Sequence, residues 1–341
     1  MKKTRLVAAG LAGLAAAASA APQVNILART DYRYDMRSGV NDTLKDNSGF
    51  DLQTLRLDLQ GSVDPSLKYR LRLRFDDKAV TTPAKDTLKG FSNYVDLAWA
   101  RQALPGGASL TVGKFFSGRA GYEGAAASLD LYQTTLVYDG TGTFHAVLGA
   151  QAGWEGAGQT VSLTVANTGI GWKGSQSGQQ HFLMVGGLWQ GTFLGGLVQP
   201  HVSFFARPTK ATDDGQFLGT VGLKGKLDKI TGELEWKGLE DTANAKGHNA
   251  FTHSTSVLVK ADLGLFRPQA KVFYDNKSVL DEKRSLERVG ITPVLEIAPI
   301  EKSSFRYHVG YSYLKEIPKG KDDRSWNKVF AGVSMNLDIL K

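Results

Sequence analysis

From Val24 onward, the sequence repeats a regular alternation of apolar and polar residues. Each repeat is about ten residues long and ends in turn-forming residues, and a period of two predicts a β-strand with one apolar and one polar face. We predict about sixteen such strands, which makes the chain an all-β protein. The predicted strands are Val24–Tyr34, Leu55–Val63, Leu67–Phe75, Phe91–Gln102, Ala108–Phe115, Thr143–Gly153, Thr160–Asn167, Gln180–Gln190, Leu197–Arg207, Phe217–Leu227, Ile230–Lys237, Thr252–Leu263, Phe266–Asp275, Leu286–Glu296, Ser304–Leu314 and Lys328–Asp338.

The clearest hairpin joins the second and third predicted strands through Asp64-Pro65-Ser66. Proline presets φ in such a turn, and the aspartate can accept hydrogen bonds from the backbone that follows. The turn predicts a register in which Leu59 lies opposite Leu71 and Tyr69 covers Gly61. A slip by one residue would place charges among leucines, so the pattern specifies this register strongly.

The connections between strands alternate in length. Counting from the N-terminus, odd connections are about nine residues or longer and even connections about seven or shorter, as in barrels with long external loops and short periplasmic turns. A backbone in hydrocarbon must satisfy every polar group internally, so a sheet there has to close. We therefore predict a transmembrane antiparallel β-barrel of about sixteen strands in contact with outer-membrane lipid.

Aromatic residues support the lipid-facing surface, since several outward positions near strand ends carry them. The alternative is a soluble all-β protein with exposed aromatics. The aromatics predicted to face outward are Tyr32, Phe75, Trp99, Trp236, Tyr274, Phe305, Tyr307, Tyr311 and Tyr313.

Residues 1–20 are predicted to be a secretory signal peptide, followed by a barrel domain over residues 21–341. Basic residues precede the apolar run Leu6–Ala17, and Ala18-Ser19-Ala20 supplies small residues for cleavage after Ala20. A membrane anchor is the alternative, but the apolar run is short for a span. The absence of cysteine fits export to an oxidising compartment. We expect the mature chain in the outer membrane of a Gram-negative bacterium.

The polar face of the third predicted strand carries a row of cations. Burying such side chains in a dry core would be costly, and sixteen strands enclose more space than side chains fill, so we predict a water-filled channel. The row can lower the energy of permeating anions, or its charges can simply solvate the lumen. Because like charges in a row repel, we expect permeating anions or loop acids to offset them. The predicted pore-lining cations are Arg29, Arg33, Arg56, Lys68, Arg70, Arg72 and Arg74.

The third long connection, residues 116–142, is the longest, and loops of that length are usually functional. We expect it to fold into the lumen and narrow the pore, with an external lid as the alternative. The residues predicted to act at this constriction are Lys114, Arg119, Glu123 and Asp130.

Catalytic and cofactor motifs are missing from the sequence, and we predict no enzyme, no cofactor and no metal site. His201 and Ser203 share one strand face, but that face points into the lumen, which argues against a lipid-cleaving dyad. The net charge of +8 could indicate nucleic-acid binding, yet the cations line an interior that a duplex cannot enter.

The signal peptide, the strands and the long third loop together resemble the trimeric porins of Gram-negative outer membranes. More narrowly, the cationic row in Leu55–Phe75 and the stretch Leu110–Phe115 resemble the phosphate-selective porin O and P family. The resemblance implies that Arg70, Arg72 and Arg74 belong to a pore ladder and Lys114 to the constriction region, and that the chain is a homotrimer. We expect passive diffusion of small hydrophilic solutes with a preference for anions, including phosphate or polyphosphate. A non-conducting structural or adhesive barrel plugged by its loop is the alternative.

Overall fold

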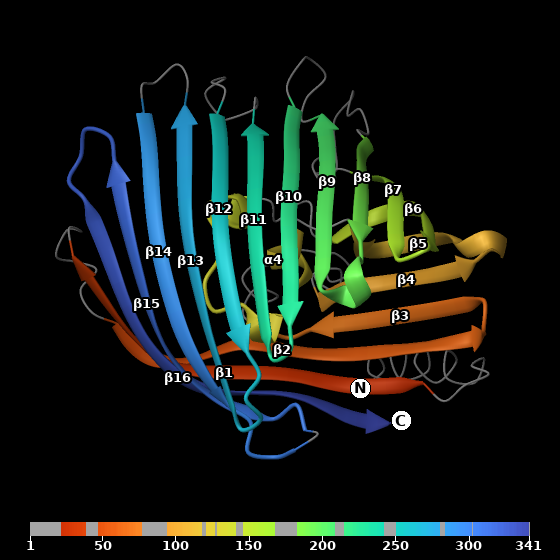
Figure 1. The fold of residues 1–341 in the computed structure, drawn as a ribbon, viewed down its shortest axis with the longest axis horizontal. Helices are drawn as coiled ribbons and strands as arrows, with labels where there is room; N and C mark the ends of the chain where they lie inside the picture. Colours follow the sequence, from red (N-terminus) through yellow and green to blue (C-terminus); the bar gives the residue numbers. More distant parts are fainter. Residues whose placement is uncertain are drawn as a thin grey trace, which may run out of the picture.

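The structure is a computed structural model that describes residues 22–38, 47–76, 94–117, 121–126, 128–140, 146–167, 183–208, 215–241, 250–279, 284–301 and 303–340. Within these ranges, sixteen antiparallel strands pair in sequence order and β16 closes on β1, so the predicted barrel is confirmed (Figure 1). None of the helices in the described ranges is long and apolar enough to cross a bilayer. The strands are β1 (Gln23–Ser38), β2 (Asn47–Asp64), β3 (Leu67–Arg74), β4 (Val95–Ala103), β5 (Ala108–Phe116), β6 (Ala146–Gly156), β7 (Gln159–Asn167), β8 (Leu183–Gly191), β9 (Val198–Pro208), β10 (Gly215–Leu227), β11 (Ile230–Asp241), β12 (Ala250–Ala261), β13 (Phe266–Val279), β14 (Arg284–Ile297), β15 (Arg306–Pro318) and β16 (Arg324–Leu340).

The two faces of the strands differ as the alternation predicts. In β7, Leu163 is 62% exposed, whereas its neighbours Ser162 and Thr164 are buried. In β9, Phe204 is exposed and Ser203 is buried. Apolar side chains therefore cover the outside of the barrel, and polar side chains are enclosed.

The predicted hairpin register of β2 and β3 is confirmed. Leu59 pairs with Leu71, and Gly61 pairs with Tyr69. A Cβ at Gly61 would lie 2.6 Å from the Tyr69 hydroxyl oxygen, so the ring covers the glycine. Asp64 accepts hydrogen bonds from backbone amides beyond the turn, which holds the hairpin end.

One predicted orientation is wrong. The pairing of β3 with β4 shifts between Arg72 and Leu73, because β4 holds an extra residue at this point. This β-bulge inverts the alternation, so Trp99 lies opposite Arg70 on the inner face instead of facing outward. Trp99 packs there against an enclosed apolar cluster. Residues 91–93 of the predicted strand lie outside the described ranges.

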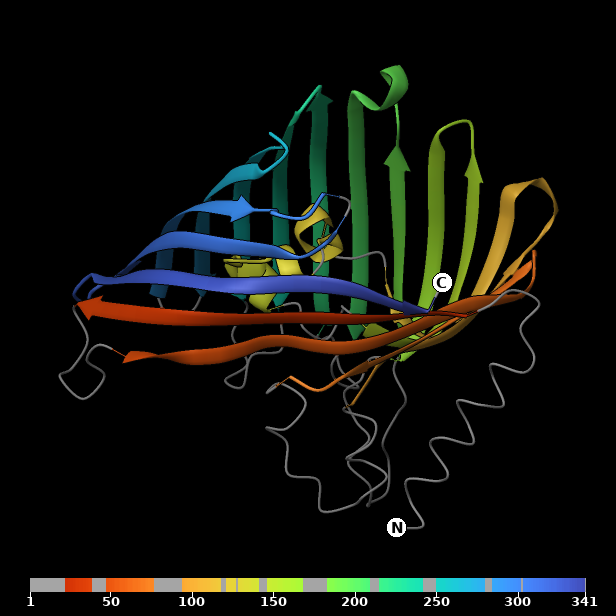
Figure 2. The ribbon, with the colours of Figure 1, turned by 90° about the horizontal axis from the view of Figure 1, so that it is seen from below.

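The described part of the third loop lies inside the barrel. It contains α4 (Gly121–Ala125), η3 (Ser128–Asp130) and α5 (Leu136–Gly140). Helix α4 contacts β9 to β11, α5 contacts β11 and β12, and η3 contacts β1. Figures 1 and 2 both show these yellow segments within the ring of strands.

The third loop rests on an apolar seat. Seven consecutive strands, β5 to β11, direct apolar side chains inward at the ends that lead into the long loops. Helix α5 places Val137 among them, and the Val137 side chain has no exposed surface. This contact removes both sides from water and fixes α5 against the wall. The cluster consists of Phe115, Val137, Val147, Ala166, Met184, Phe205, Leu218 and Leu239.

Candidate functional site

The cationic row of β3 faces the barrel interior, and each of its arginines has an aspartate partner. Arg70 donates from Nε to Asp58 over 2.8 Å, and Arg74 lies 2.9 Å from Asp76. These carboxylates come from the barrel wall of β2 and from the end of β3, and both are buried. The arginines are therefore fixed by charge-assisted hydrogen bonds.

Asp96 holds two arginines at once. Its carboxylate lies 2.7 Å from Arg72 and 3.6 Å from Arg56. Asp96 is the unpaired residue of the β4 bulge, and its carboxylate lies toward β2 and β3. Arg56 also lies 4.0 Å from Asp76.

The positive charge of the cationic row is thus offset by other groups than we expected. Aspartates next to the row neutralise much of its charge, and the described acids of the third loop pair with cations elsewhere on the wall. Lys68 is exposed and has no carboxylate partner in the described part of the chain. The group, which we call the arginine ladder, carries two more cations than anions. It consists of Arg56, Lys68, Arg70, Arg72 and Arg74 with Asp58, Asp76 and Asp96.

The two predicted cations of β1 have different surroundings. Arg33 is part-exposed and lies 2.7 Å from Asp51. Arg29 is buried, and its Nε donates to Asp31 over 3.0 Å. Arg29 also donates to the carbonyl of Leu131 over 2.9 Å, so it holds the third loop and is not presented to the lumen.

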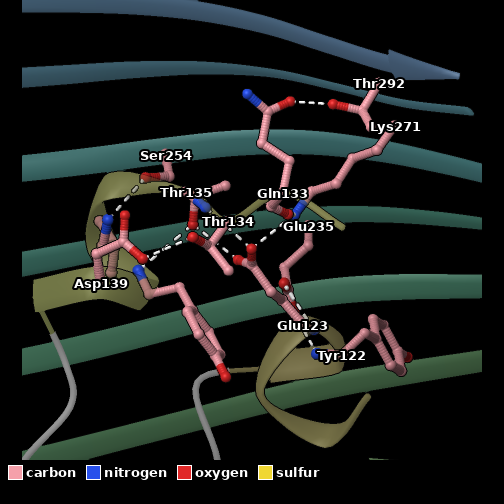
Figure 3. Close-up of polar contacts among 12 residues, drawn as sticks. Tyr122, Glu123, Gln133, Thr134, Thr135, Asp139, Glu235, Ser254, Lys271 and Thr292 are labelled. Atoms are coloured by element: carbon pink, nitrogen blue, oxygen red, sulfur yellow. Dashed lines mark hydrogen bonds and ion pairs between the residues drawn. The ribbon is translucent and has the colours of Figure 1, made fainter. Parts of the chain in front are cut away.

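Glu123 of α4 is the main anchor of the third loop (Figure 3). One of its oxygens lies 2.6 Å from Lys271 Nζ, and the other accepts from Lys237. Thr135 donates to it from its amide over 2.9 Å and from its hydroxyl over 2.7 Å. Burial opposes ionisation of Glu123, but the two ammonium groups outweigh it, so the pKa of this carboxyl lies well below its usual range.

A second carboxylate on the wall completes this anchor. Glu235 of β11 accepts from the amides of Tyr122 and Glu123, at the start of α4, and lies 2.9 Å from Lys237. Lys237 is 1% exposed and therefore sits between two carboxylates. The charges of this buried group compensate one another, which is what a buried ionic network requires.

The tip of the third loop is fixed to β14 and β15. Asp130 forms an ion pair with Arg306, whose Nε lies 3.2 Å from Glu296. The Tyr132 hydroxyl donates to Glu296 over 2.7 Å, and the Tyr132 ring lies beneath the Arg29 guanidinium, 4.1 Å from its carbon. The loop tip is thus bound by hydrogen bonds, ion pairs and ring contacts.

The return segment of the loop is bound through its backbone. The amide of Leu136 donates to Asp275 over 3.1 Å, and the same carboxylate accepts from Arg288 over 2.7 Å. Arg288 in turn donates to the carbonyl of Thr134 over 3.0 Å. Wall side chains therefore satisfy backbone groups that a short helix leaves open.

The four predicted constriction residues do not form one group. Glu123 and Asp130 lie on the inserted loop, each with wall cations. Lys114 pairs with Leu148, which is 57% exposed on the outer face, and its Nζ donates to the Val95 carbonyl. Lys114 is therefore part of the wall and does not project from the loop. Arg119 lies outside the described residues.

Sequence reasoning missed Lys237 as an interior residue. It has the same strand parity as Glu233 and Glu235 and is the last residue of the predicted strand Ile230–Lys237, which in the structure continues to Asp241. Counting the alternation one step further would have found it.

His201 and Ser203 face the interior, as their parity predicts. Both side chains contact the hydroxyl of Thr220, His201 over 3.2 Å, and both are buried. Within the described ranges, no cluster of three His, Asp or Glu residues is arranged to hold a metal ion.

Comparison with known protein families gives a match to part of the chain. The pattern of the phosphate-selective porin O and P family matches residues 24–181. Comparison with curated proteins gives no match. The fold is similar to the trimer form of OmpT, an outer membrane protein of Vibrio cholerae, with a TM-score of 0.65 and 11% identity, covering 93% of this chain and 100% of that one.

Two further solved structures have the same fold. The outer membrane channel DcaP of Acinetobacter baumannii has a TM-score of 0.65 and 12% identity, covering 93% of this chain and 97% of that one. The anion-selective porin from Comamonas acidovorans has a TM-score of 0.64 and 12% identity, covering 93% and 99%. Together with the sixteen-stranded barrel, these matches confirm the predicted resemblance: the chain has the fold of outer-membrane porins, and residues 24–181 resemble the phosphate-selective porin O and P family.

Proposed function

We propose that this protein is a passive diffusion channel for small hydrophilic solutes across the outer membrane, with a preference for anions, and not an enzyme. The observation that carries the preference is the excess of cations over carboxylates in the arginine ladder. Arg70 and Arg74 are only part-buried and offer charge to the lumen. The third loop lies across the interior and narrows the path. Phosphate and polyphosphate are the anions that the family match suggests.

Reconstitution in planar bilayers tests this function. Under a KCl gradient, an anion-preferring channel gives a reversal potential of the sign set by chloride. Arg70→Glu with Arg72→Glu changes the ladder from an excess of two positive charges to an excess of two negative ones, and should move the reversal potential toward cation preference. Lys229→Glu, in the exposed turn between β10 and β11, makes the same type of change away from the ladder and should leave it unchanged.

Two other outcomes would contradict the proposal. An unchanged potential in the ladder variant removes these arginines from the selectivity filter. Negligible conductance supports the second candidate, a structural or adhesive barrel closed by its loop, which the many loop anchors and the apolar seat favour.

We further propose that the chain is cleaved after Ala20 and assembles as a homotrimer. The OmpT structure in trimer form supports the assembly. N-terminal sequencing of the purified protein tests the cleavage, and native mass spectrometry in detergent tests the number of subunits.

A further inference from the structure

The inner wall of β5 to β8 is almost without charge. These four strands carry only two charged residues, Lys114 on the outer parity and Glu155 at the end of β6. Away from the apolar seat, the uncharged inner positions of these strands carry glycines, Leu188 and seven hydroxyl or amide side chains. These seven are Ser109 and Thr111 of β5, Gln151 of β6, Thr160, Ser162 and Thr164 of β7, and Gln190 of β8.

A cavity of about 260 Å³ lies between this neutral wall and α4. Ser109, Gln151, Ser162 and Gln190 line it, and Gly121 of α4 faces them. Its size is near the lower end for small-molecule sites, which run from about 300 to 1,000 Å³. It therefore suits a solute of a few carbon atoms.

Several polar groups in the cavity still have hydrogen-bonding capacity. The amide nitrogen of Gln151 donates to Thr164 over 3.0 Å, and that of Gln190 lies 3.0 Å from the His201 ring. The amide nitrogens are thus engaged, while both amide oxygens have no partner among the residues that the structure describes. The hydroxyls of Ser109 and Ser162 have no partner among the described residues. Two acceptors and two hydroxyls are an arrangement that matches a solute with several hydroxyl groups.

Arg101 places one cation at the edge of the same cavity. It is next to Lys68 in the β3–β4 register, and so joins the cavity to the arginine ladder. Its partner is Glu155, over 2.7 Å, and both side chains are more than a third exposed. Such an exposed pair is weak, so the guanidinium can also bind an anionic group of a solute.

We propose that this cavity binds small polyhydroxylated anions, such as sugar acids, with the anionic group at Arg101 and the hydroxylated body on the neutral wall. The proposal rests on the channel function, because the solute reaches the cavity from the lumen. It adds a solute class to a simple anion preference, since a plain anion uses only Arg101 and a neutral sugar uses only the hydroxyl and amide groups. A site that hydrogen-bonds solute hydroxyls discriminates against analogues that lack them.

Single-channel recording with three probes tests the site. Gluconate carries both features, glucose has the hydroxylated body without the charge, and acetate has the charge without the body. We expect gluconate to interrupt the KCl current at a concentration at least tenfold lower than either control. Gluconate that blocks no better than acetate would overturn the proposal.

Two variants separate the contribution of the serine hydroxyls to gluconate block from the contribution of Arg101. Ser109→Ala with Ser162→Ala removes both hydroxyls, and should raise the half-blocking concentration of gluconate severalfold while leaving acetate unaffected. The matched control, Ser312→Ala with Ser334→Ala on the inner face of β15 and β16, should change neither. Arg101→Gln should raise the half-blocking concentration of gluconate close to that of glucose. Equal block in both serine variants would contradict the site.

Calorimetry keeps the site testable if the barrel does not conduct. Gluconate titrated into the detergent-solubilised protein should release or absorb heat with a saturable curve, and Ser109→Ala with Ser162→Ala should weaken it. Conductance without saturable gluconate binding refutes the site alone, whereas binding without conductance refutes the channel alone. Heat-modifiable gel mobility like that of the unchanged protein shows that each variant folds.

Discussion

Replacing Glu123 by glutamine should release the third loop from the wall. In the protein this carboxylate neutralises Lys237 and Lys271, and the glutamine amide cannot. Lys237 keeps Glu235 at 2.9 Å, but Lys271 loses its carboxylate. Breaking a buried pair by removing one partner costs about 3–5 kcal/mol. Because every 1.4 kcal/mol is about tenfold in an equilibrium, the undocked loop becomes roughly a hundredfold to a few thousandfold more populated.

Amide hydrogen exchange measures this population directly, because the Thr135 amide donates to Glu123 in the docked loop. Peptides covering residues 121–140 of the Glu123→Gln variant should exchange faster by that factor. Asp262→Asn is the control, since this carboxylate is exposed and contacts Arg267 at 3.3 Å and the Gly264 amide at 3.1 Å, both far from the third loop. It should leave exchange of the loop unchanged. Equal exchange of the loop in both variants would refute the assignment of Glu123 as its anchor.

Three further predictions concern charge, pH and packing. Asp96→Asn, which removes the shared partner of Arg56 and Arg72, should increase anion preference in the salt-gradient measurement, and a shift toward cations would contradict the ladder assignment. The lowered pKa of Glu123 stabilises the docked loop above the ordinary carboxyl range, and this stabilisation should persist as pH falls to about 4.5 and disappear only as pH falls through the lowered value. Burial, aided by Glu235 and Glu233, raises the pKa of Tyr122 to about 12. The contribution of the neutral Tyr122 hydroxyl to the stability of the docked loop should therefore be complete below its ordinary pKa of about 10 and be lost as pH rises through 12. Amide exchange of the loop, corrected for intrinsic rates, checks both the acid and the alkaline limit. Gly149→Ala should lower the yield of heat-modifiable folded barrel, because its Cβ would lie 2.3 Å from the Val165 carbonyl oxygen, whereas Gly219→Ala, with no atom within 4 Å, should fold normally.

The strands were predictable because their signal is local. Alternation identifies all sixteen in order, and the turn at Asp64 sets the β2–β3 register through nearby residues. Several ends were misplaced, since β1 and β2 continue through polar residues to Ser38 and from Asn47. Hydrogen bonding between strands needs no apolar face, so the pattern loses its signal before the sheet ends.

The bulge and the loop contacts were not predictable from local pattern. The extra residue of β4, Asp96, reverses the facing of Trp99, and nothing in the surrounding alternation marks it. Glu123 lies more than a hundred positions from Lys237 and Lys271 in sequence, so no spacing rule connects them. Their proximity follows from barrel closure and from the path of the loop, which only the folded chain defines.

The seam between β1 and β16 also governs how the barrel assembles. Along this seam Val24 meets Leu340 and Ser38 meets Ser325, so its partners are separated by almost the whole chain, whereas the other fifteen pairings join consecutive strands. Ring closure must wait until the last strand has been synthesised and delivered, and such long-range pairing is slow. Until then two unpaired edges remain open to foreign strands, which makes the period before closure the stage most vulnerable to aggregation.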